Sequence, residues 1–150
     1  MDPLPKRIQL PHEIPEWVDP AQEVYFVTLC SEPKGFNQIC VPGTAEKLID
    51  SVKFRHDQQI WFVHVLLLMP DHVHAPISFF QDQVSIRQSI GSWKSFTAKT
   101  LGIKWQKSYF EHRLRSDESF TEKAEYIMNN PVRAGLATKS EEWAHVFKGE

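Results

Sequence analysis

The stretch that decides the fold is residues 59–79, QIWFVHVLLLMPDHVHAPISF. Its first half, residues 59–69, is a long apolar run that predicts a buried central strand. Met69-Pro70-Asp71 carries turn residues, and residues 72–79 predict the antiparallel return strand of a hairpin. Side chains alternate between the two faces of a strand, so the return strand has a polar and an apolar face. The polar face carries His72, His74 and Ser78, and the apolar face carries Val73, Ala75, Ile77 and Phe79.

The patterns on either side of this hairpin complete an alternation of strands and helices. Strands are predicted at residues 23–30 and 103–109, and helices at residues 44–56 and 84–101. A last helix opens at the S-x-x-E capping box of Ser119 and Glu122 and is stopped by Pro131. The order β-α-β-β-α-β plus a helix predicts an α+β, ferredoxin-like (split β-α-β) fold. Its antiparallel sheet has helices on one face and the other face free for a ligand.

The length of 150 residues predicts one domain with a substantial core. Five of the ten prolines lie in residues 1–20, so we expect an extended arm over residues 1–21, a catalytic domain over 22–137 and a tail over 138–150. No apolar stretch is long enough for a bilayer, and no secretory leader is visible. Cys30 and Cys40 form no CxxC pair, which favours reduced thiols and a cytoplasmic location.

The charges are unevenly distributed along the chain. Residues 87–139 hold ten Lys or Arg and five Asp or Glu, a net charge of +5, whereas the rest of the chain carries −7. Such asymmetry indicates either a basic face for a polyanion or a solvated helical surface, and charge alone does not decide between them.

The histidines of the polar face are candidates for a metal site. His72 and His74 are two residues apart in a strand, so their Cα atoms lie about 6.6 Å apart and both imidazoles can reach one divalent ion. The alternative is a pair of hydrogen-bonded strand histidines without a ligand. His64, in the apolar run, is predicted to be a core histidine.

Tyr126 is a candidate nucleophile. At about 100° per residue, the apolar side chains of the last helix form one stripe, and Tyr126 lies well off it. Asn130, one turn further on, shares the face of Tyr126, so a nucleophile and an amide ligand could address the same ion. The alternative is an exposed tyrosine at the rim. The role of His112 stays open, and Trp105 is the best candidate for base stacking although a core position is favoured for it.

Two motifs in this order, M-P-D-H-V-H at residues 69–74 and Y-I-M-N-N-P-V-R-A-G-L at residues 126–136, resemble those of the single-tyrosine HUH transposases. The resemblance is greatest to the branch of REP-associated tyrosine transposases. It is supported by W-Q-K-S-Y-F at residues 105–110 and by the strand at residues 24–29, and it runs over about residues 22–137.

The resemblance implies a transposase that cleaves and rejoins single-stranded DNA through a covalent 5′-phosphotyrosine. Tyr126 would be the nucleophile, and His72, His74 and Asn130 would bind Mg²⁺ or Mn²⁺. The DNA would often be a hairpin with flanking bases, and the protein would act as a monomer or a homodimer away from membranes. The residues expected to bind DNA are Arg87, Lys94, Trp105, Gln106, Lys107, Arg113, Arg115 and Arg133.

Pro76 and the net acidity depart from the family pattern. Relatives carry an aliphatic residue in place of Pro76, which removes one ladder hydrogen bond, so we expect a bulge or an unpaired position there. These departures leave a second hypothesis, a domesticated binder of nucleic-acid hairpins that does not cleave. A nucleotide hydrolase with a histidine triad ranks last, because the third alternating position holds this proline.

Overall fold

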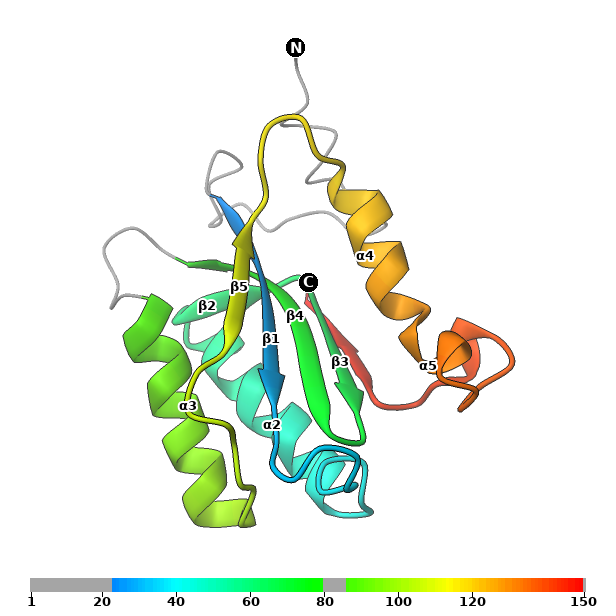
Figure 1. The fold of residues 1–150 in the computed structure, drawn as a ribbon. Coiled ribbons are helices and arrows are strands. Elements are labelled where there is room, and N and C mark those ends of the chain that lie inside the picture. Colours follow the sequence, from blue (N-terminus) through cyan, green and yellow to red (C-terminus); the bar gives the residue numbers. More distant parts are fainter. Residues whose placement is uncertain (1–22, 80–85, 150) are drawn as a thin grey trace.

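The computed structural model describes residues 23–79 and 86–149, and an antiparallel sheet of six strands lies at its centre (Figure 1). The order along the sheet is β5-β1-β4-β3-β6, and the short β2 pairs with β4. The strands are β1 (Val24–Cys30), β2 (Trp61–Val63), β3 (Val65–Met69), β4 (His72–Phe79), β5 (Phe110–Arg113) and β6 (Val146–Lys148). The predicted α+β, split β-α-β fold is therefore confirmed. The arm predicted for residues 1–21 lies outside the described residues.

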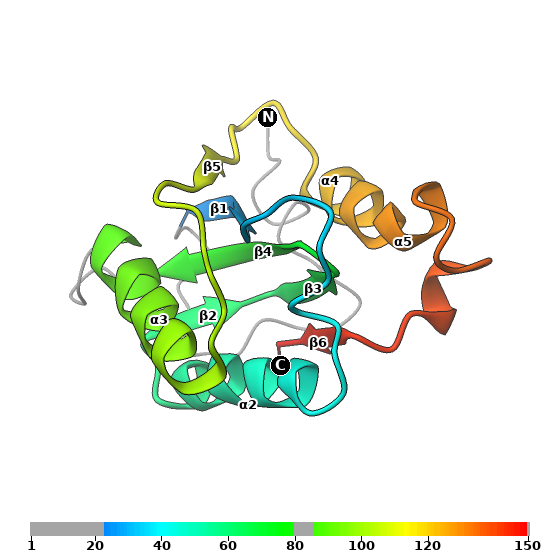
Figure 2. The same cartoon turned by 60° about the horizontal axis from the view of Figure 1, so that its bottom comes forward.

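The helices form layers on both faces of the sheet, as Figures 1 and 2 show. Helices α2 (Thr44–Asp57) and α3 (Ile86–Leu101) cover one face, and α4 (Phe120–Met128) lies against the other. A short helix, α5 (Asn130–Arg133), and a 3-10 turn (Ser140–Glu142) follow α4. The second face is thus only partly covered, and it is the face that can take a ligand.

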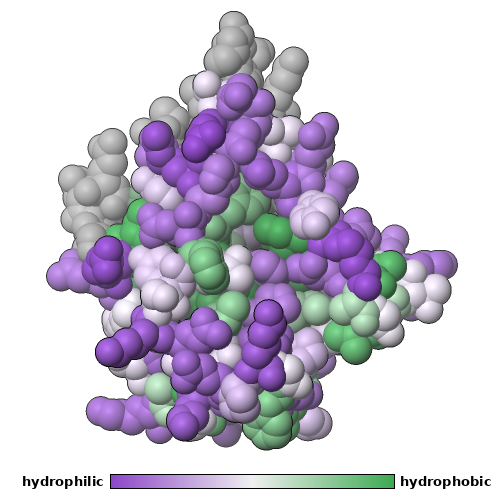
Figure 3. Space-filling view, viewed as in Figure 1, coloured by the Kyte–Doolittle hydropathy of each residue, from purple (hydrophilic) through white to green (hydrophobic). Residues whose placement is uncertain are grey.

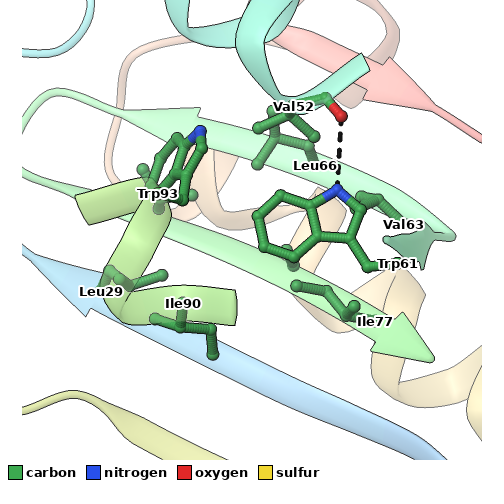
Figure 4. A pocket seen from close by; sticks show the side chains of 10 residues that line it. Leu29, Val52, Trp61, Val63, Leu66, Ile77, Ile90 and Trp93 are labelled. Carbon is green, nitrogen blue, oxygen red and sulfur yellow. Dashed lines mark hydrogen bonds between the residues drawn. The ribbon is translucent and has the colours of Figure 1, made fainter. Parts of the chain in front are cut away.

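The two faces of β4 have the division that the sequence predicts. Its apolar residues lie in the main core under α2 and α3, whereas the histidines face α4. A small apolar cavity of about 20 Å³ remains in this core (Figure 4). Beside it the indole Nε1 of Trp61 donates a hydrogen bond of 3.3 Å to the carbonyl of Val52, which ties the start of β2 to α2.

A bulge opposite Pro76 divides the predicted strand 59–69 into β2 and β3. Val63 pairs with Ile77 and Leu67 pairs with His74, so three residues on one side lie opposite two on β4. The N–H of His64 donates to the carbonyl of Pro76 at 2.9 Å. The irregularity expected from the proline is therefore present, but it lies in the partner strand, because β4 itself continues through Pro76.

His64 is a core histidine, as predicted. It is fully buried, and its Nε2 makes a hydrogen bond of 2.9 Å with Ser78. Its ring packs against Phe62 and against Phe120 of α4. Burial, with a smaller effect of neighbouring His56, lowers the pKa of His64 to about 3, so the imidazole is neutral in the folded protein at neutral pH.

Residues after 137 contribute to the sheet, although no strand is predicted there. β6 pairs with β3, and the indole Nε1 of Trp143 donates a hydrogen bond of 2.9 Å to the carbonyl of Leu68. The N–H of Gly149 donates to the carbonyl of His64 at 3.1 Å, next to the bulge. With three residues, β6 is too short for a clear alternation in the sequence.

Two boundaries differ from the prediction. The strand predicted at residues 103–109 is wrong in position: this segment makes only an isolated bridge between Trp105 and Ser31, and β5 starts at Phe110. The predicted stop of the last helix at Pro131 is also wrong, because α4 ends at Met128 and the proline stands in the first turn of α5. A proline at that position needs no N–H partner and has a helical φ.

Among the described residues, no helix is long and apolar enough to span a membrane. Cys30 and Cys40 are both free thiols, which agrees with the prediction of reduced cysteines.

We predict that the free energy of unfolding falls as the pH is lowered below about 6.5. In the unfolded chain His64 takes up a proton near that pH, whereas its pKa in the fold is about 3. Between these values the unfolded state binds more protons, so the contribution of neutral His64 is complete above pH 6.5 and is lost as the pH falls toward 3. Urea titrations at a series of pH values should give a slope that reaches about 1.4 kcal/mol per pH unit for this group.

The variant His64→Gln isolates the contribution of His64. It retains a polar group for Ser78 but cannot be protonated, so it should reduce the slope, and the part that remains is expected from His74, whose pKa is also lowered, to about 4. An undiminished slope in His64→Gln would assign the pH dependence to another group.

Gly149→Ala should lower the free energy of unfolding by about 1–3 kcal/mol, the usual cost of overpacking a core. A Cβ at Gly149 would lie 2.0 Å from the carbonyl oxygen of Val63, so backbone would have to move. The matched control is Gly91→Ala in α3, where a Cβ meets nothing within 4 Å. It should stabilise the protein by about 0.5–1 kcal/mol through helix propensity. Chemical denaturation of both variants measures the predicted opposite signs; equal stabilities would contradict the close packing at Gly149.

Candidate active site

His72 and His74 stand side by side at the start of β4, on the face that points toward α4. Their ring centroids are 4.8 Å apart, with the ring planes nearly perpendicular. Nδ1 of His72 is 2.8 Å from Oδ1 of Asp71, and Nδ1 of His74 is 3.0 Å from Oγ1 of Thr28 in the neighbouring strand. Each ring is therefore oriented through Nδ1. Among the described residues, none makes a hydrogen bond with Nε2 of His72 or with Nε2 of His74.

Asp71 sets the tautomer of His72. Burial raises the pKa of this carboxyl group, but hydrogen bonds from His72 and from the N–H of Gly35 outweigh burial and hold the pKa below its usual range. An ionised carboxylate only accepts hydrogen bonds, so Nδ1 of His72 must carry a proton. In the neutral ring the lone pair is then on Nε2, which is the arrangement that metal-binding histidines have when a carboxylate supports them.

His74 is more deeply placed than His72. Burial, then the charge of His72 and then that of Arg133, lower the pKa of His74 to about 4. The ring is therefore neutral at physiological pH and keeps a lone pair for a ligand. Thr28 orients it because β1 pairs with β4 in a register that places Thr28 opposite His74.

A cleft of about 540 Å³ runs between the sheet and α4. Figure 3 shows apolar surface at the bottom of the hollow between β5 and α4, with hydrophilic residues around it. His74 and Tyr126 both line this cleft, so the structure brings one predicted ligand and the predicted nucleophile together. The residues that line it are Phe26, Thr28, His74, Phe110, Glu111, His112, Glu122, Lys123, Tyr126 and Ile127.

Tyr126 is exposed on α4, as the helical pattern predicts. Tyr126 is 65% exposed, whereas Phe120 and Ala124 of the apolar stripe are buried against β1. Ser119 is the N-cap of α4, and its Oγ accepts a hydrogen bond of 3.1 Å from the N–H of Glu122. This cap and the buried stripe fix which side of the helix carries the tyrosine.

Asn130 does not share a continuous helix with Tyr126, which corrects the geometric expectation from i, i+4 spacing. Asn129 ends α4, and Asn130 is the first residue of α5. Arg133 nevertheless joins the two side chains. Its Nη2 donates to Oδ1 of Asn130 at 2.5 Å, and its guanidinium carbon lies 3.7 Å from the centroid of the Tyr126 ring.

The donor set fits a divalent cation in part. The Nε2 atoms of His72 and His74 make no hydrogen bond with the described residues. Imidazole nitrogens suit Mn²⁺ or Mg²⁺ less well than carboxylate oxygens do, but the amide oxygen of Asn130 is a ligand of the type that these ions prefer. That oxygen is engaged by Arg133. Within residues 23–79 and 86–149 there is no cluster of three or more His, Cys, Asp or Glu that could hold a metal ion. A site here would therefore depend on Asn130 as its third ligand.

The predicted DNA-binding residues do not form one patch. Arg87, Lys107 and Arg115 are exposed, and Arg113 is exposed but ion-paired with Glu23. Lys94 donates hydrogen bonds to the carbonyls of Gln106 and Lys107, so its charge secures the α3–β5 connection.

The indole of Trp105 is only partly accessible. Its ring centroid is 5.5 Å from that of Trp93, and its Nε1 donates to Oγ1 of Thr97. These contacts favour the core position over the base-stacking role for this tryptophan.

Two residues of the cleft were not singled out as functional from the sequence. Phe110 is 69% exposed at the mouth of the cleft and lies opposite Thr28 in the β1–β5 register. His112 also lines the cleft, and its Nε2 is bound by the carboxylate of Glu118 at 2.9 Å. The alternation of β5 could have identified both residues, but the strand was predicted some residues too early.

The domain thus combines a split β-α-β sheet that carries a histidine pair with a helix that carries an exposed tyrosine. The solved structures that are similar to it include the following two. One is a REP-associated tyrosine transposase bound to a REP hairpin, with a TM-score of 0.70, 18% identity, and coverage of 83% of this chain and 76% of that chain. The other is a "putative transposase" from Deinococcus radiodurans R1, with a TM-score of 0.54, 20% identity, and coverage of 79% and 96%.

In sequence, the chain is similar to an uncharacterized protein of Haemophilus influenzae. The two are 24% identical over an aligned region that covers 72% of this chain and 79% of the relative. No protein-family model matches the sequence. The comparisons therefore establish a shared fold with the transposase structures.

His72 and His112 should carry their protons on different ring nitrogens. A carboxylate accepts a hydrogen bond from Nδ1 of His72 and from Nε2 of His112, so neutral His72 should be the Nδ1–H tautomer and neutral His112 the Nε2–H tautomer. Long-range ¹H–¹⁵N correlation spectra, recorded above the titration of the imidazoles, distinguish the two forms. Asp71→Asn should remove the preference of His72 and leave that of His112 unchanged. A His72 ring protonated on Nε2 in the unmodified protein would contradict the role of Asp71.

Proposed function

We propose that this protein is a tyrosine HUH transposase, which cleaves single-stranded DNA and transfers the strand through a covalent 5′-phosphotyrosine. The observation that carries the proposal is the single cleft lined by Tyr126 and His74, with His72 beside it. The similarity in fold to a transposase bound to a REP hairpin supports hairpin-forming DNA as the substrate.

Tyr126 performs the covalent step in this proposal. Its Oη attacks the phosphorus of a phosphodiester, the Tyr–O–P bond forms, and the bond from phosphorus to the 3′ oxygen breaks. The 3′ oxygen leaves with a proton, and the phenol loses one. A phenol is protonated at neutral pH, so a base must accept its proton. Glu122, one helical turn before Tyr126, and His112 line the same cleft and are the groups available for this role.

His72, His74 and Asn130 would hold Mg²⁺ or Mn²⁺. Such an ion supplies a Lewis acid that withdraws negative charge from the phosphoryl oxygens in the transition state. Asp71 and Thr28 contribute by fixing the orientation of the two imidazoles before DNA arrives.

Strand transfer is the reverse of cleavage with a different DNA end. The 3′ hydroxyl of the incoming strand attacks the phosphotyrosine, loses its proton, and releases Tyr126, which regains one. One phosphodiester is broken and one is formed, so the reaction needs no nucleotide cofactor.

The DNA would lie along the open face of the sheet. Phe110 offers an exposed ring at the mouth of the cleft, where a base next to the cleaved phosphate can stack. Arg115, an exposed cation just after β5, would contact the phosphate backbone, which makes binding dependent on salt concentration, whereas Arg87 lies on α3, the helix that covers the opposite face.

Replacing the nucleophile tests the proposal directly. Labelled single-stranded DNA from the flanks of the gene, incubated with protein and Mn²⁺ and resolved under denaturing conditions, should give a covalent adduct. Tyr126→Phe should abolish the adduct without loss of DNA binding, because it removes only the attacking oxygen. Tyr25→Phe, which changes a tyrosine on the opposite face of β1, is the matched control and should form the adduct normally. An adduct that persists in Tyr126→Phe would eliminate Tyr126 as the nucleophile.

Removal of metal belongs to the same experiment. A chelator should stop adduct formation, and restored Mn²⁺ should recover it; activity that is unchanged in chelator would exclude the metal role of His72 and His74. If the protein binds hairpin DNA but never forms an adduct, the alternative of a domesticated, non-cleaving binder replaces the transposase.

A further inference from the structure

Arg133 contacts two side chains that the proposed chemistry uses, those of Tyr126 and Asn130. Its guanidinium lies over the ring of Tyr126 and donates a hydrogen bond to Oδ1 of Asn130. The short helix α5 fixes its backbone, since the N–H of Arg133 donates to the carbonyl of Asn129 at 3.0 Å. One side chain therefore holds both the nucleophile and the amide oxygen that the cation would need.

No carboxylate neutralises this arginine among residues 23–79 and 86–149. Two nearby cations are paired, by contrast: Lys123, which lines the cleft, lies 3.3 Å from Glu118, and Arg113 of β5 is paired with Glu23. An exposed guanidinium that is held only by an aromatic face and an amide retains its capacity for an anion. The guanidinium is bonded to the amide oxygen that the cation would need, so a cation bound at this oxygen would be repelled by the charge of Arg133.

We propose that Arg133 binds the phosphodiester to be cleaved, and that it leaves Asn130 and Tyr126 for this phosphate when DNA enters the cleft. The proposal rests on the proposed function. A guanidinium makes two parallel hydrogen bonds to a phosphate, which are stronger than its bond to an amide oxygen. The move frees Oδ1 of Asn130 for the cation and the ring of Tyr126 for attack. It also neutralises the charge that opposes the cation, so DNA and metal bind cooperatively.

The first test measures Mn²⁺ binding by electron paramagnetic resonance, with and without single-stranded DNA, in the Tyr126→Phe background so that no cleavage occurs. Without DNA, Arg133→Gln should bind Mn²⁺ about fivefold more tightly, the effect expected from removing one nearby charge in a high dielectric. The increase in Mn²⁺ affinity on addition of DNA, expected with Arg133 present, should be lost in Arg133→Gln.

The matched control is Lys53→Gln, which removes a positive charge from α2 on the opposite face of the sheet (Figure 2). Lys53→Gln should bind Mn²⁺ as tightly as the Tyr126→Phe protein in which Lys53 is intact. If Arg133→Gln and Lys53→Gln both leave Mn²⁺ binding and its response to DNA unchanged, the role of Arg133 is wrong.

The second test uses Arg133→Lys with Tyr126 intact. This variant keeps the charge, so Mn²⁺ binding without DNA should match that of the original protein. It loses the planar fork, so the rate of adduct formation at saturating DNA should fall about a hundredfold. A rate equal to that of the original protein would overturn the phosphate contact.

The outcomes separate this inference from the proposed function. An adduct on Tyr126 together with unaltered Mn²⁺ binding in Arg133→Gln rejects only the role of Arg133. Absence of any adduct in the original protein rejects the proposed function, and the Mn²⁺ measurements then still decide whether Arg133 opposes the cation.

Discussion

The antiparallel pairing of β1 with β4 is the constraint on which the rest of the molecule depends. It runs without interruption from Val24 opposite Ser78 to Cys30 opposite His72. Because side chains alternate along both strands, this register sends one apolar set into the core under α2 and α3 and turns the histidines toward α4. A slip by one residue would bury the imidazoles among the core tryptophans and expose the apolar set to solvent. The site therefore exists only in this register.

Three neighbouring groups orient the side chains of the candidate site. Asp71 and Thr28 each hold Nδ1 of a histidine, and Arg133 covers both the tyrosine ring and the amide. The histidines are thus oriented before a ligand binds. In the proposed mechanism, Arg133 exchanges its contacts with the tyrosine and the amide for a phosphate of the DNA.

The sequence predicted the fold well where apolar periodicity was long and unambiguous. The hairpin at residues 59–79, the two faces of β4 and the exposure of Tyr126 all followed from alternation or helical spacing. Short elements escaped prediction: β5 was placed too early, and β6 has too few residues for a pattern. The break between α4 and α5 was missed because helical spacing continues through it. The contacts of Arg133 depend on tertiary placement and have no signal in spacing.

The way in which α4 is attached to the sheet affects both the local opening of this helix and its tolerance of substitutions. α4 rests on a small satellite cluster around Phe26 and Phe120, whereas the sheet is stabilised mainly by the larger core on its opposite face. Local opening of this helix exposes less apolar surface than global unfolding, so its amides should exchange with solvent through a subglobal event. The segment that carries the tyrosine is therefore a separable unit of stability. Substitutions there can alter or end the proposed DNA cleavage while the sheet stays folded.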